Sequence, residues 1–178
     1  DWAKNYDGNL LKNSTKGLPA NFSCLDLTAG FGKDALEISK VVNCKSLVLV
    51  EKEAWVFELL VDGIKNISCS RAGDLLKKFK TFNMDNLEFL ESKNETFDLI
   101  YLDPMFLGVK KSKAKKHMQA LRDLSTAVIQ KKLLKKSLDL ANYRVIVKRH
   151  KNMEYLEGIV PNRSVKGKVV RYDIYNTN

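Results

Sequence analysis

The stretch that decides the fold reads Phe97-Asp98-Leu99-Ile100-Tyr101-Leu102-Asp103-Pro104-Met105-Phe106. Its centre is a short, almost unbroken apolar run, which is typical of a strand covered on both faces in a parallel sheet. Proline has no backbone N–H and favours extended geometry in the residue before it, so we expect Asp103 at the last position of the strand. Ligands of open α/β sheets bind beyond the carboxyl ends of the strands. The sequence therefore predicts a functional role for Asp103.

Similar apolar runs recur along the chain and alternate with helical patterns. Strands are expected at 23–27, 46–50, 79–84, 97–103 and 143–148. Helices are expected from near 35, at about 53–67, from near 87, and at 113–125 and 128–142. Two β-rich arms around Lys166-Gly167 predict an antiparallel hairpin near the end of the chain. This alternation indicates an α/β fold, with a mostly parallel, doubly wound sheet and an antiparallel C-terminal hairpin.

The domain organisation follows from the length of 178 residues, which suits one domain with one buried core. We expect residues 1–22 to be an N-terminal segment and residues 23–178 to be the single domain. The first residue is Asp1 and not methionine, so we expect the N-terminal segment to be truncated.

Positive charge is concentrated in one part of the chain. Residues 110–151, called the basic segment below, carry 14 of the 31 lysines and arginines and only two acids. Their net charge is +12, whereas the rest of the chain sums to −2. Such a patch is the electrostatic footprint of a polyanion partner. The alternative is a set of solvated, lysine-rich helix faces, and charge alone does not separate the two.

Other features narrow the class of protein. No apolar run approaches the ~20 residues that span a bilayer, and no signal-peptide pattern opens the chain, so no membrane role is expected. Cys24, Cys44 and Cys69 form no CxxC pair, and buried, reduced thiols in a cytoplasmic protein are expected. With only His117 and His150 besides, no metal site is expected.

A glycine pair and an acid predict a nucleoside cofactor. Gly30-Phe31-Gly32 lies between an expected strand and helix, where glycine allows the backbone to approach a ligand closely. Glu51 ends the next strand, where a carboxylate can accept both hydroxyls of a ribose. Because Gly30-x-Gly32-x-x-Ala35 also satisfies a relaxed dinucleotide fingerprint, NAD remains a competitor here. The alternatives are a tight turn for the glycines and a helix N-terminal acid for Glu51.

Asp85 and Asn86 end the third expected strand, where an adenine ring would lie if Glu51 holds its ribose. The alternative is capping of the following helix, for which Asp and Asn are preferred residues.

The tetrapeptide Asp103-Pro104-Met105-Phe106 distinguishes between NAD and a methyl-donating nucleoside cofactor. An exocyclic amine of a nucleobase is a poor nucleophile because its lone pair is delocalised into the ring. The Asp103 carboxylate and the Pro104 carbonyl could accept its two N–H bonds and direct the lone pair towards a methyl donor, while Phe106 stacks on the base. Hydride transfer has no evident use for this set, so we expect catalytic roles for Asp103, Pro104 and Phe106.

The same tetrapeptide resembles the (Asp/Asn)-Pro-Pro-aromatic motif of amino-group methyltransferases, with Met105 in place of the second proline. From about residue 10 to its end, the chain more closely resembles the ribosomal RNA small subunit methyltransferase J family (RsmJ). The blocks that carry the resemblance are Asp26 to Ala35, Tyr101 to Phe106, Lys111 to Met118, Arg144 to Arg149, and Pro161-Asn162 through Tyr172 to Tyr175. Leu107 and His117 depart from the family pattern, and the family's N-terminal portion is largely missing.

This resemblance implies a Rossmann-like class I methyltransferase that uses S-adenosylmethionine. The family methylates the N2 amine of a guanine near the 3′ end of 16S rRNA, so 16S rRNA or the small ribosomal subunit is the expected partner. Cofactor contacts are expected from Gly30, Gly32, Lys33, Asp34, Glu51, Lys52, Asp85, Asn86 and Asp103. At Asp85-Asn86 the family tends to have serines.

The basic segment then acquires a use, because lysines directly after the target-amine site could hold RNA phosphates. Such contacts position RNA without specifying its sequence, and the guanine itself must be unstacked. The expected RNA-binding residues are Lys110, Lys111, Lys113, Lys115, Lys116, Lys148 and Arg149. Two alternatives stay open: methylation of another nucleobase amine, such as adenine N6 in RNA or DNA, and a non-catalytic RNA-binding module with a nucleotide fold.

Overall fold

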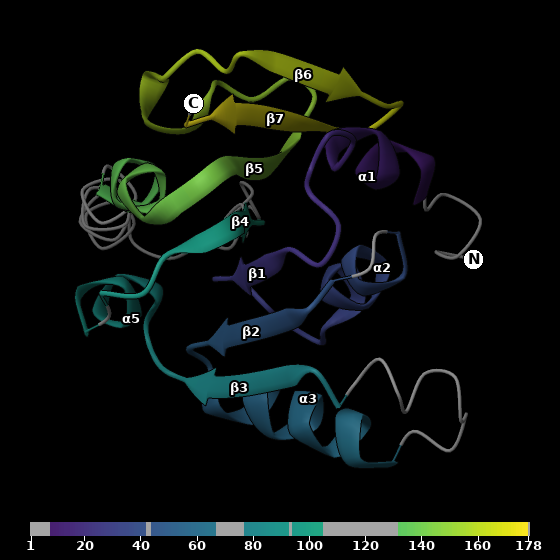
Figure 1. The fold of residues 1–178 in the computed structure, drawn as a ribbon, viewed down its shortest axis with the longest axis vertical. Helices are drawn as coiled ribbons and strands as arrows, with labels where there is room; N and C mark the ends of the chain where they lie inside the picture. The colour runs from purple at the N-terminus through teal and green to yellow at the C-terminus, as the bar shows by residue number, and fades with distance from the viewer. Residues whose placement is uncertain (1–7, 42–43, 67–76, 93, 105–131, 178) are drawn as a thin grey trace, which may run out of the picture.

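The computed structural model describes residues 8–41, 44–66, 77–92, 94–104 and 132–177. Its centre is a seven-stranded sheet with the strand order β3-β2-β1-β4-β5-β7-β6 (Figure 1). The strands are β1 Ser23–Asp26, β2 Ser46–Glu51, β3 Phe79–Asn83, β4 Phe97–Leu102, β5 Ala141–His150, β6 Arg163–Lys166 and β7 Val170–Asn176.

Five strands are parallel and two are not. The neighbours from β3 to β5 pair in parallel, whereas β7 pairs antiparallel with both β5 and β6. The predicted α/β sheet with an antiparallel C-terminal hairpin is therefore confirmed. The chain passes from β1 to β2 and β3 towards one edge, and then β4 and β5 extend the sheet on the other side of β1. The switch point between β1 and β4 is where ligands bind in open α/β sheets.

Helices cover both faces of the sheet (Figure 1). They are α1 Gly8–Ser14, α2 Lys33–Val41, α3 Ala54–Asn66 and α5 Asn86–Ser92, together with a helix over 132–140 and a 3-10 turn at Leu156–Gly158. Within the described residues, no helix is long and apolar enough to cross a membrane.

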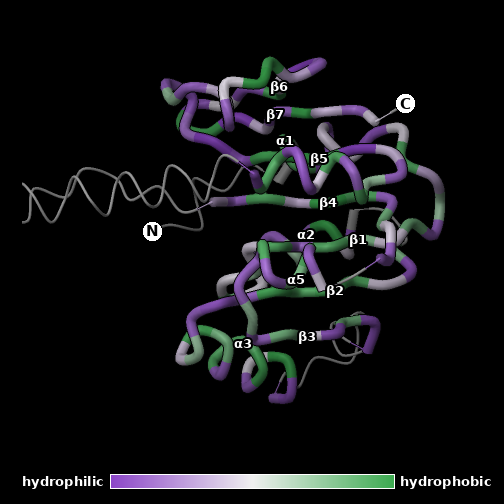
Figure 2. Tube along the Cα trace, turned by 90° about the vertical axis from the view of Figure 1, so that its left-hand side faces the viewer, coloured by the Kyte–Doolittle hydropathy of each residue, from purple (hydrophilic) through white to green (hydrophobic). Residues whose placement is uncertain are grey.

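Each face of the sheet has its own hydrophobic core, and β4 contributes to both. Leu99 and Tyr101 pack into the core under α1, α2 and α3. Ile100 and Leu102 point the other way, into the core under α5 and the helix over 132–140. This double coverage explains why the strand is apolar at successive positions, and Figure 2 shows hydrophobic colouring along the inner strands.

Some predicted bounds need adjustment. The helix predicted at 128–142 ends at residue 140, because Ala141 is buried and pairs with Phe97 as the first residue of β5. The helix predicted at 113–125 lies outside the described residues. In the N-terminal segment, Leu10 and Leu11 of α1 are buried in the same core as α2.

The two described cysteines are buried and free. Cys24 lies in β1 and Cys44 just before β2. Burial raises the pKa of the Cys24 thiol and raises that of Cys44 to about 11. Both thiols are therefore protonated at neutral pH, as expected for structural cysteines.

Candidate active site

The loop after β1 is held between the two neighbouring strands. The Leu27 N–H donates to the Tyr101 carbonyl of β4 (3.1 Å), and the Ala29 N–H donates to the Val50 carbonyl of β2 (3.0 Å). Gly30 and Gly32 both have positive φ, 52° and 74°. The predicted glycine loop is thus a tight turn fixed at the switch point of the sheet.

The Glu51 carboxylate ties this turn to the next element. Its Oε2 accepts the Gly30 N–H (2.9 Å), and its Oε1 accepts the Glu53 N–H (2.9 Å) just before α3. The Asn83 side chain at the end of β3 donates to the carbonyls of Glu51 (2.8 Å) and Lys52 (3.2 Å). The carboxyl ends of β1, β2 and β3 are therefore connected through one acidic residue.

Asp85 caps the helix that follows β3. Its Oδ1 accepts the Leu87 N–H at 2.9 Å, and its carbonyl accepts the Phe89 N–H. This is the capping geometry that the sequence left open as the alternative. A cofactor contact of Asp85 or Asn86 stays a prediction.

Asp103 was predicted as the last residue of its strand, but β4 ends at Leu102 and Asp103 directly follows it, one position beyond the strand. Its backbone N–H donates to the Thr28 hydroxyl at 2.6 Å, and the Thr28 N–H donates to Asp26 Oδ1 at 3.0 Å. Pro104 is buried. The loop after β1 thus fixes the backbone at the predicted catalytic acid.

One lysine joins two of the predicted site acids. Lys148 Nζ of β5 lies 2.8 Å from Asp103 Oδ2 and 2.7 Å from Asp34 Oδ2 in the first turn of α2. The Tyr101 hydroxyl also donates to Asp34 Oδ2, at 2.7 Å. We call Asp34, Tyr101, Asp103 and Lys148 the carboxylate–lysine cluster.

Burial and charge shift the pKa values in this cluster. For Asp103, burial raises the pKa, the Lys148 ammonium opposes this, and Asp34 adds to the rise. For Lys148, burial disfavours the ammonium, but the carboxylates of Asp103 and Asp34 outweigh it and raise the pKa above its usual value. Lys148 is therefore a permanent positive charge between two acids at neutral pH.

Asp26 is a site acid that sequence reasoning missed. It ends β1, is 1% exposed, and has its pKa raised by burial to about 7, with Asp34 and Asp103 contributing and Thr28 opposing. The signal was present, because Asp26 ends an apolar strand in the same way as Asp103. Within the described residues, no group of acids, histidines and cysteines could hold a metal ion.

The predicted RNA-binding residues fall into two groups. Lys148 belongs to the carboxylate–lysine cluster, and the buried Arg149 guanidinium donates to the Glu154 carbonyl at 3.0 and 3.3 Å. These contacts differ from the open phosphate contacts expected from charge, which stay a prediction. The other predicted residues, Lys110, Lys111, Lys113, Lys115 and Lys116, lie outside the described residues, as does Phe106.

Two exposed aromatic rings, one inside the glycine turn and one in α3, were also missed. Phe31 is 65% exposed and Trp55 of α3 is 61% exposed. Their ring centroids lie 6.3 Å apart in an edge-to-face arrangement. The sequence shows Phe31 and Trp55 only as two separate aromatic residues. Their contact depends on how the loop after β1 packs against α3.

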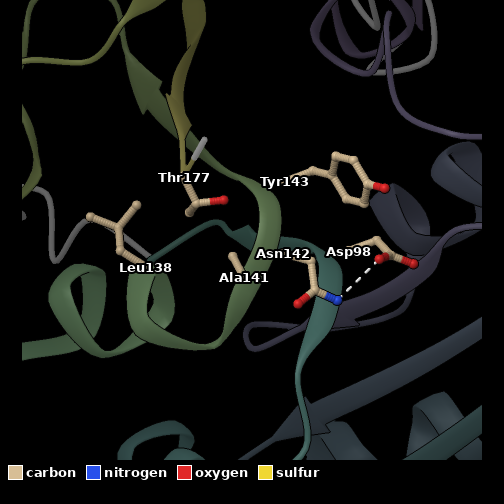
Figure 3. Close-up of a pocket in the computed structure, with 6 residues that line it drawn as sticks. All are labelled: Asp98, Leu138, Ala141, Asn142, Tyr143 and Thr177. Carbon is tan, nitrogen blue, oxygen red and sulfur yellow. Dashed lines mark hydrogen bonds between the residues drawn. The ribbon is translucent and has the colours of Figure 1, made fainter.

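A surface pocket of about 500 Å³ lies at the opposite end of the sheet (Figure 3). Its lining residues are Asp98, Leu138, Ala141, Asn142, Tyr143 and Thr177. They gather at the amino ends of β4 and β5, and Asp98 already accepts hydrogen bonds from Asn142 and from Ser23. The pocket therefore does not take part in the site at the carboxyl ends of the strands.

Comparison with known proteins identifies the family. The family model described as SAM-dependent methyltransferase matches residues 10–177, almost the whole described chain. The chain belongs to this family. S-adenosylmethionine is the cofactor named in the description of this family, which confirms the predicted cofactor and leaves NAD without support.

Curated relatives of the chain carry the family name expected from the sequence. Ribosomal RNA small subunit methyltransferase J of Hydrogenovibrio crunogenus is 36% identical over 157 residues, covering 85% of this chain and 56% of the relative. The protein of the same name from Francisella philomiragia is 32% identical over 160 residues, covering 85% and 65%. The predicted resemblance is confirmed, and the chain spans less than two thirds of these relatives.

A solved structure supports the same fold. The SAM-dependent methyltransferase NGO1261 from Neisseria gonorrhoeae superposes with a TM-score of 0.72 at 25% identity. The match covers 92% of this chain and 67% of that one. The chain thus has the class I, Rossmann-like fold that the sequence predicted.

Proposed function

We propose that this chain methylates the N2 amine of a guanosine in 16S rRNA, using S-adenosylmethionine. The observation that carries the proposal is the placement of Asp103-Pro104 at the switch point, where Thr28 and Lys148 hold the acid. Relatives named as small-subunit ribosomal RNA methyltransferases support an RNA substrate. With that substrate, the proposal includes the small ribosomal subunit as partner and a cytoplasmic location.

The residues around the glycine turn fit the cofactor. A Cβ built on Gly30 meets nothing within 4 Å, so the turn borders open space beside Glu51. The two oxygens of an ionised carboxylate accept about four hydrogen bonds, and among the described residues Glu51 accepts two, from Gly30 and Glu53. We assign cofactor contacts to Gly30, Gly32, Lys33, Asp34, Glu51, Lys52, Asp85, Asn86 and Asp103.

The bound cofactor supplies an electrophilic methyl group, and the chain's own residues prepare the nucleophile. Asp103 Oδ2 accepts the hydrogen bond from Lys148, whereas Oδ1 accepts none from the described residues. In the proposal, Oδ1 and the Pro104 carbonyl accept the two N–H bonds of the target amine. Phe106 stacks on the guanine, and Asp103 accepts the proton that the amine loses. Positioning of this kind lowers the barrier without covalent catalysis.

The basic segment supplies the contacts to the RNA backbone. Its lysines at 110, 111, 113, 115 and 116 follow the target-amine site in sequence. Neutralising several phosphates makes binding strongly dependent on salt. We therefore expect affinity for RNA to fall steeply as the salt concentration rises.

Methyl transfer onto small subunits that lack the modification tests the proposal. Labelled S-adenosylmethionine should label 16S rRNA, and mass spectrometry of the digested RNA should find N2-methylguanosine. Asp103→Ala should lower the rate by at least about 100-fold, the size typical of lost catalytic groups. Asp98→Asn is the matched control, since it changes an acid at the opposite end of β4.

Three outcomes separate the alternatives. Full activity of Asp103→Ala would remove the catalytic assignment. Label found in N6-methyladenosine would move the target to another nucleobase amine. Binding of RNA without binding of S-adenosylmethionine in calorimetry would favour the non-catalytic module.

A further inference from the structure

We infer that Lys148 is a positioning residue, whose ammonium fixes the Asp103 carboxylate as the acceptor for the target amine. The inference rests on the proposed function for the identity of that amine. It assigns to Lys148 a role that differs from the phosphate contact suggested by its place in the basic segment.

The register of the sheet brings the two residues together. Leu102 of β4 pairs with Val147 of β5 in parallel, so the next residues on the two strands, Asp103 and Lys148, are neighbours. The Lys148 side chain is 20% exposed, and those of Asp34 and Asp103 are 12% and 30% exposed. The ion pairs are thus largely shielded from water, where charge-assisted hydrogen bonds are stronger than on an open surface.

The hydrogen bonds leave Asp103 little freedom. Its backbone N–H is held by Thr28, and its Oδ2 is held by Lys148. Lys148 is itself fixed by Asp34, which also accepts the Tyr101 hydroxyl bond. One ammonium therefore couples an acid in the first turn of α2, predicted to face the cofactor, to the acid predicted to face the amine.

The groups that face Asp103 give Lys148 an electrostatic role as well. Asp26 of β1 and Asp34 of α2 are like charges, and Tyr101 of β4 carries a protonated hydroxyl because burial raises its pKa. Tyr172 of β7 is the sheet partner of Lys148 in β5. Removing the ammonium would leave Asp103 half-buried beside two acids, so its pKa would rise further. A protonated Asp103 offers one acceptor fewer to the amine.

The test compares Lys148→Met with Lys148→Arg in the full chain, and Lys166→Met serves as the control at an exposed lysine of β6. We expect Lys148→Met to lower kcat at neutral pH at least tenfold and to move the acid limb of the pH–rate profile to higher pH. Lys148→Arg keeps the charge and should leave the acid limb near its wild-type position. Lys166→Met should change neither.

A titration without substrate provides an independent readout. The Asp103 carboxyl carbon, followed by NMR in chains labelled at aspartate, should titrate at higher pH in Lys148→Met than in the wild type. This measurement needs neither RNA nor turnover, so it tests the inference even if guanine is not the target. Where Lys148→Met does not fold, as judged by circular dichroism, Lys148→Gln takes its place with the same expectation.

Two results would overturn the inference. One is an unchanged Asp103 titration in the neutral variant. The other is a variant with wild-type kcat and pH profile and a raised KM for RNA alone, which would assign Lys148 to phosphate binding. Failure of the proposed function looks different, since Asp103→Ala would then remain active while the Asp103 titration still responds to Lys148.

Discussion

The free energy of unfolding of the wild-type chain should fall as the pH rises, because of Asp26, and Asp26→Asn should remove this fall. Asp26 is 1% exposed in the centre of the sheet, and burial raises its pKa to about 7. In the unfolded chain the same carboxyl has an ordinary pKa near 3.8. A group whose pKa is raised on folding stabilises the fold below its unfolded pKa, and this contribution is lost as the pH passes its folded pKa.

The magnitude follows from the width of that window. Each unit of pKa difference corresponds to about 1.4 kcal/mol. Between pH 5 and pH 8 the unfolded carboxyl stays ionised, whereas the folded one loses its proton near pH 7. The Asp26 contribution to the free energy of unfolding should therefore fall by about 3 kcal/mol over this interval. Asparagine cannot titrate, so the variant should lack this fall.

Urea unfolding followed by circular dichroism at pH 5, 6, 7 and 8 measures the effect. The readout is the difference between the pH dependence of the wild type and that of Asp26→Asn, so slopes from other groups cancel. Asp98 does not interfere, because hydrogen bonds from Ser23 and Asn142 outweigh its burial and lower its pKa. Its contribution is lost as the pH falls through this lowered pKa, which lies outside the interval. Parallel curves for the two proteins would refute the reasoning.

Two further predictions concern the glycine turn. Gly32→Ala should lower the free energy of unfolding by about 1–3 kcal/mol, since the φ of Gly32 is +74° and an added Cβ would lie 2.7 Å from Leu60 Cδ1. The control is Gly63→Ala in α3, where an added Cβ meets nothing within 4 Å, and it should be neutral or stabilising by up to about 1 kcal/mol. Urea titrations that rank the two variants the other way would contradict this prediction. Glu51→Gln should weaken S-adenosylmethionine binding at least about tenfold in calorimetry, the effect of losing one charge-assisted hydrogen bond. One amide oxygen cannot both accept the Gly30 and Glu53 N–H bonds, as the two carboxylate oxygens do, and accept the ribose hydroxyls. Unchanged affinity would argue against the ribose assignment.

The fold was predictable because the strands carry a strong local signal. Leu99 and Ile100 face opposite cores, so both must be apolar, and the run of four apolar residues reports a doubly covered strand. The ends of elements were less predictable. Ala141 continues a helical pattern in sequence, and only its pairing with Phe97 makes it the first residue of β5.

The candidate site was predictable where a single residue carries a local constraint. Pro104 indicated the end of β4 to within one residue, since the strand ends at Leu102, and the glycines of the turn marked the loop after β1. The role of Lys148 depends instead on β5 lying beside β4 in a given register, which no local pattern in the sequence determines. Because Lys148 lies in the basic segment, it was predicted to bind RNA together with the other lysines of that segment.

The arrangement at the switch point also explains why the site needs a cation. The fold brings Asp26 and Asp103, at the carboxyl ends of β1 and β4, close to Asp34 in the first turn of α2. Burial together with mutual repulsion raises the pKa values of Asp26 and Asp103. Asp26 has no ion pair with a described residue and is half protonated near pH 7. Burial and Asp34 also raise the pKa of Asp103, but the Lys148 ammonium opposes that rise. Asp103 differs from Asp26 in its greater exposure and in its contact with Lys148. In the inference drawn above, that contact keeps the acid at the amine site available as an acceptor.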